Sequence, residues 1–122
     1  MLAGKRALRV GDLIKKEISY LLLENVKDPR VAGVTITGIN LSNDLKRAKV
    51  FFSVIGDEHE IEKAGAGLAR ATGFIKREIG LRMSLRYVPE LIFIYDPSLE
   101  SGNSMERLFE KLKTDESEND VR

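Results

Sequence analysis

The densest group of residues that could do chemistry in this sequence is a set of cations between positions 70 and 86. The set consists of Arg70, Lys76, Arg77, Arg82 and Arg86, and Glu78 is the only acid among them. Basic side chains on a surface supply affinity for phosphates that does not depend on nucleotide sequence. RNA contact is therefore one interpretation of this set. The alternative is a solvated surface that only keeps the protein soluble.

A second basic group lies near the N-terminus. On a helix, Lys5, Arg9, Lys16 and Tyr20 project within about a quarter-turn of one another, because each residue advances by 100°. Cations in this arrangement can follow a phosphate backbone while the ring stacks on a base. The alternative is a solvated helix face whose lysine stems cover the edge of the core.

Signals for catalysis are few. His59 is the single histidine, and it stands among Asp57, Glu58, Glu60 and Glu62. No second histidine lies at metal-binding spacing, so a first helical turn whose acids complement the helix dipole explains the cluster more simply. The sequence has no cysteine, Walker loop or nucleophile elbow. We expect no enzyme activity, no metal and no cofactor.

Length and charge indicate one domain with a basic body. A chain of 122 residues that is 43% hydrophobic can build a single core. Residues 1–90 hold 16 Lys and Arg against 11 Asp and Glu, whereas residues 91–122 hold 4 against 8. The body could therefore attract a polyanion. No apolar run is long enough to span a membrane, so we expect neither secretion nor a membrane partner. The absence of cysteine suits a reducing cytoplasm, where we expect the protein. We further expect a monomer with no small-molecule substrate.

Hydrophobic periodicity predicts a helix over residues 6–26, ended by Asp28-Pro29, because the residue before proline favours extended geometry. Two β-rich segments follow, at 34–42 and 47–55, and we expect them to form an antiparallel hairpin with a β-bulge at Gly38. The apolar stripe expected on the helix comprises Val10, Leu13, Ile14, Ile18, Leu21 and Leu22.

Residues 61–79 keep helical spacing, but Gly73 beside Thr72 is a poor helix interior and predicts a kink or break. A helix that begins after Gly73 would present its unpaired N–H groups between basic residues, as a cradle for phosphate. Gly73 would also let the two helices cross closely. The alternative is that this glycine has only the second role, and the two roles do not exclude each other.

The remaining segments complete an α+β fold. Residues 91–95 predict the third strand of an antiparallel or mixed sheet that carries helices on one face. Residues 98–113 predict a marginal further helix, and the acidic segment 114–122 has too little apolar surface to order itself. We expect a single domain at 1–113 followed by a disordered tail at 114–122.

Short motifs spread over most of the chain match a known family pattern. They are Arg9-Val10, Ile14-Lys15-Lys16-Glu17-Ile18, Asp28-Pro29-Arg30, Val34-Thr35-Ile36-Thr37, Ser42-Asn43-Asp44-Leu45, Ala48-Lys49-Val50-Phe51, Ala71-Thr72-Gly73 and Arg86-Tyr87-Val88-Pro89-Glu90-Leu91-Ile92-Phe93. Together they resemble the bacterial ribosome-binding factor A family. In that family an Ala-x-Gly kink stands where a KH domain carries its GXXG backbone clamp, and Ala71-Thr72-Gly73 fits it.

The resemblance implies a KH-like (type II) domain with the order helix, strand, strand, helix, kink, helix, strand. It also implies a maturation factor that binds the small ribosomal subunit and its 16S rRNA during late assembly, including maturation of the rRNA 5′ region, with a role in growth at low temperature. The RNA-binding residues expected on this basis are Lys5, Arg9, Lys16, Arg70, Ala71, Thr72, Gly73, Lys76, Arg77, Arg82 and Arg86. The alternatives are a protein-interaction module with no direct RNA contact and, formally, an acid–base enzyme around His59.

Overall fold

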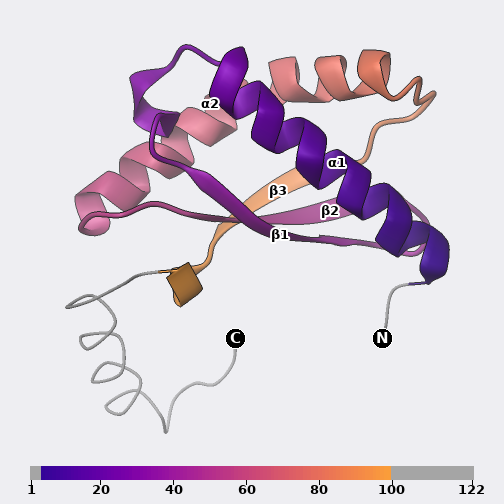
Figure 1. The fold of residues 1–122 in the computed structure, drawn as a ribbon, viewed down its shortest axis with the longest axis horizontal. Helices are drawn as coiled ribbons and strands as arrows, with labels where there is room; N and C mark the ends of the chain where they lie inside the picture. The colour runs from indigo at the N-terminus through magenta and orange to yellow at the C-terminus, as the bar shows by residue number, and fades with distance from the viewer. Residues whose placement is uncertain (1–3, 100–122) are drawn as a thin grey trace, which may run out of the picture.

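Two helices lie on one face of a three-stranded sheet in the computed structural model, which describes residues 4–99 (Figure 1). In chain order the elements are helix α1 (Lys5–Glu24), the 3-10 turn η1 (Pro29–Val31), strands β1 (Thr35–Leu41) and β2 (Arg47–Ser53), helix α2 (Glu58–Arg82), strand β3 (Glu90–Tyr95) and the 3-10 turn η2 (Pro97–Leu99). The expected α+β class is confirmed.

The sheet is mixed and has the order β1-β2-β3. β1 runs antiparallel to β2, and β3 runs parallel to β2. Ile36 pairs with Phe52 and Gly38 with Phe51, so Thr37 is an extra residue in β1. This register shift confirms the β-bulge predicted at Gly38.

The core lies between the helices and the sheet face that carries Val50, Phe52 and Leu91. Burial of an aliphatic or aromatic side chain of this size contributes roughly 1.5–3 kcal/mol, which makes this layer the main source of stability. The largest fully buried side chains are Ile14, Ile18, Leu21, Val31, Val50, Leu68, Ile75 and Ile79.

Leu13 does not join this core, contrary to the prediction. Its side chain is 47% exposed, whereas Ile14 and Ile18 on the same helix are fully buried. Leu13 lies about 100° around the helix from Ile14, on the side that turns away from the sheet.

The prediction of a break at Gly73 is also wrong, because α2 is one continuous helix of 25 residues. Its two halves nevertheless run in different directions in Figure 1. The Thr72 hydroxyl donates a hydrogen bond to the Leu68 carbonyl oxygen at 2.9 Å. Such bonds from a side chain to the preceding turn often bend helices. The kink is therefore a bend within one helix, and no second helix begins after Gly73.

The predicted close helix crossing at Gly73 is wrong as well. A Cβ atom placed on Gly73 would meet nothing within 4 Å. The close approaches lie elsewhere on α2: a Cβ on Gly67 would stand 2.8 Å from Cγ1 of Val31, and one on Gly80 would stand 3.0 Å from Cγ2 of Val88. Gly67 thus allows η1 to pack against α2.

The chain leaves the sheet through Asp96, whose carboxylate accepts a hydrogen bond from the Thr37 hydroxyl at 2.7 Å. This bond and a second one from the Ser98 N–H lower the pKa of Asp96. At the start of the helix predicted over 98–113 the structure has the 3-10 turn η2. Residues 100–113 and the predicted tail 114–122 lie outside the described residues. Within residues 4–99, no helix is long and apolar enough to cross a membrane.

Candidate nucleic-acid interface

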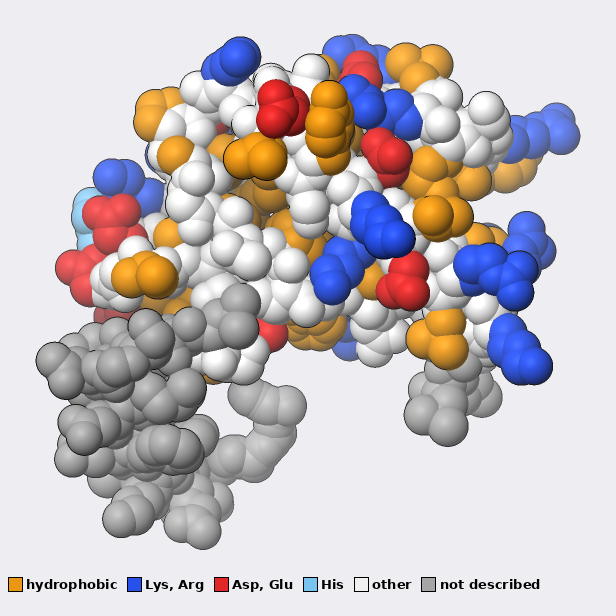
Figure 2. Space-filling model, viewed as in Figure 1, with side chains coloured by type: hydrophobic (Ala, Val, Ile, Leu, Met, Phe, Trp, Pro, Cys, Tyr) orange, Lys and Arg blue, Asp and Glu red, His pale blue; other side chains and the backbone are white. Residues whose placement is uncertain are grey.

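The outer face of α1 carries the first predicted group. Lys5, Arg9 and Lys16 are exposed, and Tyr20 is 49% exposed. Figure 2 shows Lys and Arg side chains gathered on the side of the molecule where α1 begins. This end of the helix is fixed by the hairpin, because Oδ1 of Asn43 accepts a hydrogen bond from the Gly4 N–H at 2.6 Å. The three cations therefore project from a helix whose start is held in place.

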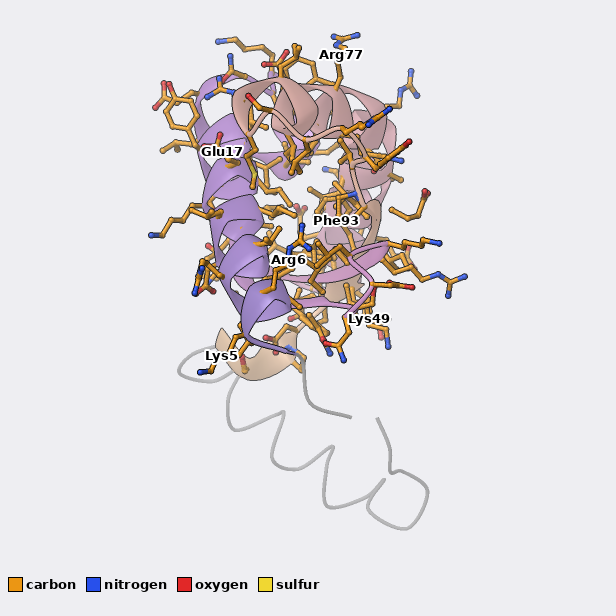
Figure 3. The ribbon with its side chains drawn as sticks, turned by 90° about the vertical axis from the view of Figure 1, so that its right-hand side faces the viewer. Lys5, Arg6, Glu17, Lys49, Arg77 and Phe93 are labelled. Carbon is orange, nitrogen blue, oxygen red and sulfur yellow. The ribbon has the colours of Figure 1, made fainter. Side chains whose placement is uncertain are left out.

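Four cations of the second group are exposed on and after α2, and three of them have no ion pair within residues 4–99. Arg70 and Arg77 lie on α2, and Arg86 lies in the connection to β3. The Arg77 guanidinium stands 5.8 Å from the centroid of the Phe74 ring, and Arg86 stands 5.7 Å from that of Tyr87. Figure 3 shows Arg77 on the outside of α2 and Lys5 at the opposite end of the view. Within the part of the chain that the structure describes, these side chains can reach a phosphate without breaking an ion pair.

Lys76 and Arg82, in contrast, are engaged in contacts between elements. Nζ of Lys76 lies 3.3 Å from Oε1 of Glu90 on β3. Arg82 lies 3.6 Å from Oε1 of Glu17 on α1 and 5.0 Å from the Tyr20 ring centroid. Lys76 therefore links α2 to β3, and Arg82 links α2 to α1. From the sequence, Glu78 was the only acid expected near these cations.

The Ala71-Thr72-Gly73 segment does not form the predicted phosphate cradle. Ala71 and Thr72 are half-buried and Gly73 is exposed, all within the continuous part of α2. Backbone N–H groups inside a helix donate to the preceding turn and are not free for a ligand. Any contact that this segment makes with RNA must involve its outer surface and the cations beside it.

A pocket of about 250 Å³ lies beside Ala71, between the end of α1 and the middle of α2. Its lining residues are Asn25, Val26, Lys27, Asp28, Arg70, Ala71 and Phe74. Sequence reasoning placed Arg70 and Ala71 in the site but missed Asn25, Lys27 and Phe74. Only the tertiary fold brings the 25–28 segment against α2, so no local signal could have identified them.

The Asp28-Pro29-Arg30 motif forms one wall of this region. Both carboxylate oxygens of Asp28 accept hydrogen bonds from the Arg30 guanidinium, the shortest at 2.6 Å, and the Arg30 backbone N–H donates another at 2.9 Å. These bonds, with a smaller effect of the nearby Arg70 charge, lower the pKa of Asp28 from 3.8 to about 2. The negative charge of Asp28 is therefore matched within the motif.

The acids around His59 are placed as expected for a helix start. The Asp57 carboxylate caps α2 by accepting a hydrogen bond from the Glu60 N–H at 3.0 Å, and Glu58 and Glu60 lie in the first turn. Among the residues that the structure describes, no group of three or more His, Cys, Asp and Glu side chains could hold a metal ion. This cluster is accounted for by helix capping.

Comparison with known proteins identifies the family of this chain. The family model described as "Ribosome-binding factor A" matches residues 6–109. The chain belongs to the ribosome-binding factor A family. A ribosome-binding factor A from Halothermothrix orenii is 48% identical over 112 residues, which cover 92% of each chain. A second, from Staphylococcus epidermidis, is 50% identical over 107 residues, which cover 88% of this chain and 92% of that one.

Solved structures of ribosome-binding factor A proteins share the fold. A solution structure of such a protein from Thermotoga maritima has a TM-score of 0.68 at 29% identity and covers 84% of this chain and 97% of its own. A homology model of the Thermus thermophilus ribosome-binding factor A, fitted into the cryo-EM map of a complex of 30S with that protein, has a TM-score of 0.55 at 23% identity. It covers 72% of this chain and 97% of its own. The KH-like arrangement expected from the sequence is consistent with these neighbours.

Proposed function

We propose that this protein binds the small ribosomal subunit and its 16S rRNA during late assembly, including maturation of the rRNA 5′ region, and acts in the cytoplasm as a monomer. The observation that carries the proposal is membership of the ribosome-binding factor A family along most of the chain. The neighbour fitted into a map of a 30S complex supports the small subunit as the partner. The protein would act by binding alone and catalyse no reaction.

The exposed cations on α1 and α2 would supply the binding energy. Phosphate contacts position a protein on RNA and do not depend on sequence. The two helices are fixed on the sheet by a buried core and by the Arg82–Glu17 contact, so the cations are held at set positions relative to one another. A rigid surface that binds one rRNA arrangement better than others shifts the population toward that arrangement.

Co-sedimentation with isolated small subunits, large subunits and joined ribosomes tests this proposal. We expect the protein to travel with small subunits and to be released as salt rises, because phosphate contacts weaken with salt. The variant Lys5→Glu/Arg9→Glu/Lys16→Glu should lose this association. Lys49→Glu is a control for a charge reversal outside the proposed interface, to be compared with Arg9→Glu alone, since Lys49 is exposed on the sheet face opposite the helices (Figure 3).

Two results would contradict the proposal. Equal association with small and large subunits would show that the protein does not bind the small subunit specifically. Association that persists in high salt and survives the triple charge reversal would indicate a mainly apolar contact with a protein, because such a contact is not screened.

A further inference from the structure

The pocket between the end of α1 and the middle of α2 combines apolar walls with a polar rim. Val26, Ala71 and Phe74 supply apolar surface. Asn25, Lys27 and Arg70 add an amide and two cations, and all three are exposed. The volume of about 250 Å³ lies below the roughly 300–1,000 Å³ of pockets for drug-sized ligands. The pocket therefore fits a ligand smaller than a drug-sized molecule, of the size of a single ring system.

The pocket is held open by contacts that need no ligand. The backbone N–H groups of Asn25 and Val26 both donate to the Leu21 carbonyl oxygen, at 2.8 and 2.9 Å, which fixes the end of α1. The Asp28–Arg30 bonds fix the next turn of the chain. Gly67 lets that turn lie directly on α2. A site formed in advance in this way loses little conformational entropy when a ligand binds.

The charge at the rim favours an anionic group beside the ring. Lys27 and Arg70 form no ion pair with any of residues 4–99. The one acid of the lining, Asp28, is neutralised by Arg30 at 2.6 Å. The Arg77 guanidinium lies over the Phe74 ring, 5.8 Å from its centroid, and adds a third cation next to the pocket. An aromatic ring with free cations nearby is the combination that binds bases and phosphates of single-stranded RNA.

We propose that this pocket binds one unpaired nucleobase of RNA. The base stacks on Phe74, the Asn25 amide bonds to its polar edge, and Lys27 and Arg70 contact the phosphates on either side. Paired bases are excluded, because a base inside a duplex cannot enter a pocket without leaving its stack. The inference rests on the proposed RNA-binding function and specifies which feature of the RNA this surface recognises.

The test compares two single-stranded probes, a decamer of adenosine and an abasic ribose-phosphate decamer of the same charge. We expect the wild-type protein to prefer the adenosine decamer. Phe74→Leu and Ala71→Met should each reduce that affinity about tenfold, by removing the stacking surface or by filling the pocket, and should leave the abasic affinity unchanged. Phe51→Leu, on the opposite sheet face, is the matched aromatic control.

Thermal unfolding checks that each variant is folded. If Phe74→Leu does not fold, Ala71→Met still decides the test. Unchanged adenosine affinity in the folded variants would overturn the inference, as would equal losses for both probes. Failure of the inference is distinguishable from failure of the proposed function. In the first case Phe74→Leu still co-sediments with small subunits like the wild type, whereas in the second the wild type itself does not.

Discussion

Arg82 shows at the scale of one residue why a cation in a basic region need not be available to RNA. Oε1 of Glu17 is buried and has no hydrogen-bond partner among residues 4–99, and the Arg82 guanidinium lies 3.6 Å from it. The charge of Arg82 thus lies beside the buried oxygen of a carboxylate whose side chain is otherwise about one-third exposed. We infer that its main role is to hold α1 against α2.

Arg82→Met should therefore lower the free energy of unfolding by about 0.5–1 kcal/mol, because the partly exposed Glu17 carboxylate loses a counter-charge that water already screens in part. Small-subunit binding should change much less. Chemical denaturation measures the first effect and co-sedimentation the second. The double variant Arg82→Met/Glu17→Met should recover part of the lost stability. A stable Arg82→Met variant that no longer binds would instead assign Arg82 to the RNA interface.

Asp28 gives a prediction for acid pH. Its pKa is about 2 in the folded protein, below the value of 3.8 that the unfolded chain restores. A lowered pKa stabilises the folded state fully above the unfolded value, and this contribution disappears as pH falls through the folded value. Asp28→Asn should therefore be less stable than wild type at pH 6. The difference in melting temperature should shrink between pH 4 and about pH 2. A difference that is constant over this range would exclude the ion pair as its cause.

At the scale of the element, two of the glycines of α2 differ in the space around them: Gly67 is closely packed and Gly73 is open. Gly67→Ala should lower the free energy of unfolding by about 1–2 kcal/mol, because its Cβ would press on the buried Val31 side chain. Gly73→Ala should raise it by roughly 0.5–1 kcal/mol, since alanine favours the helix and finds open space. Urea denaturation of both variants measures the two changes in the free energy of unfolding. Destabilisation by Gly73→Ala would indicate that the bend needs glycine.

The elements could be predicted from the sequence, whereas the contacts between them could not. Apolar periodicity located both helices, and the change of phase at Gly38 located the bulge. The same reasoning allowed a break as well as a kink at Gly73, because it weighed local propensity alone. In the folded protein, tertiary packing of Ile75 and Ile79 keeps the helix continuous past that point.

In the candidate site, too, the exposure of single residues could be predicted from the sequence, whereas contacts between elements could not. Exposure of Lys5, Arg9 and Arg77 follows from helical spacing, and the structure agrees. The pairing of Lys76 with Glu90 and the pocket beside Ala71 depend on residues from separate elements. Spacing along one helix carries no information about such neighbours, so these features appear only in the fold.

At the scale of the whole molecule, binding to small subunits should depend on salt in proportion to the phosphates contacted. Replacing Lys5, Arg9 and Lys16 by glutamine removes three exposed cations. The slope of log affinity against log salt concentration should become shallower by about 2–3, since each phosphate contact contributes about 0.7–0.9. Titrations at several salt concentrations measure this slope. An unchanged slope would remove α1 from the interface.

The segment 114–122 offers a second test at this scale. It contains the four acids Asp115, Glu116, Glu118 and Asp120, with Val121 as its one apolar side chain. We propose that its deletion costs little stability and strengthens non-specific RNA binding at low salt, where the lost negative charge is least screened. Melting temperature and filter binding measure the two effects. A marked fall in melting temperature would show that the segment packs on the domain.

The parallel pairing of β2 with β3 has a consequence for how the protein is made. β2 is the central strand, yet its second edge is covered only by β3, and the whole of α2 lies between these strands in the chain. During synthesis, α1 and the hairpin leave the ribosome first, with the edge of β2 unpaired and its apolar side chains without their α2 partners. An exposed strand edge of this kind is prone to pair with another chain. The slow step of folding should therefore be the long-range closure of β3 onto β2, and the nascent hairpin is the species most exposed to aggregation.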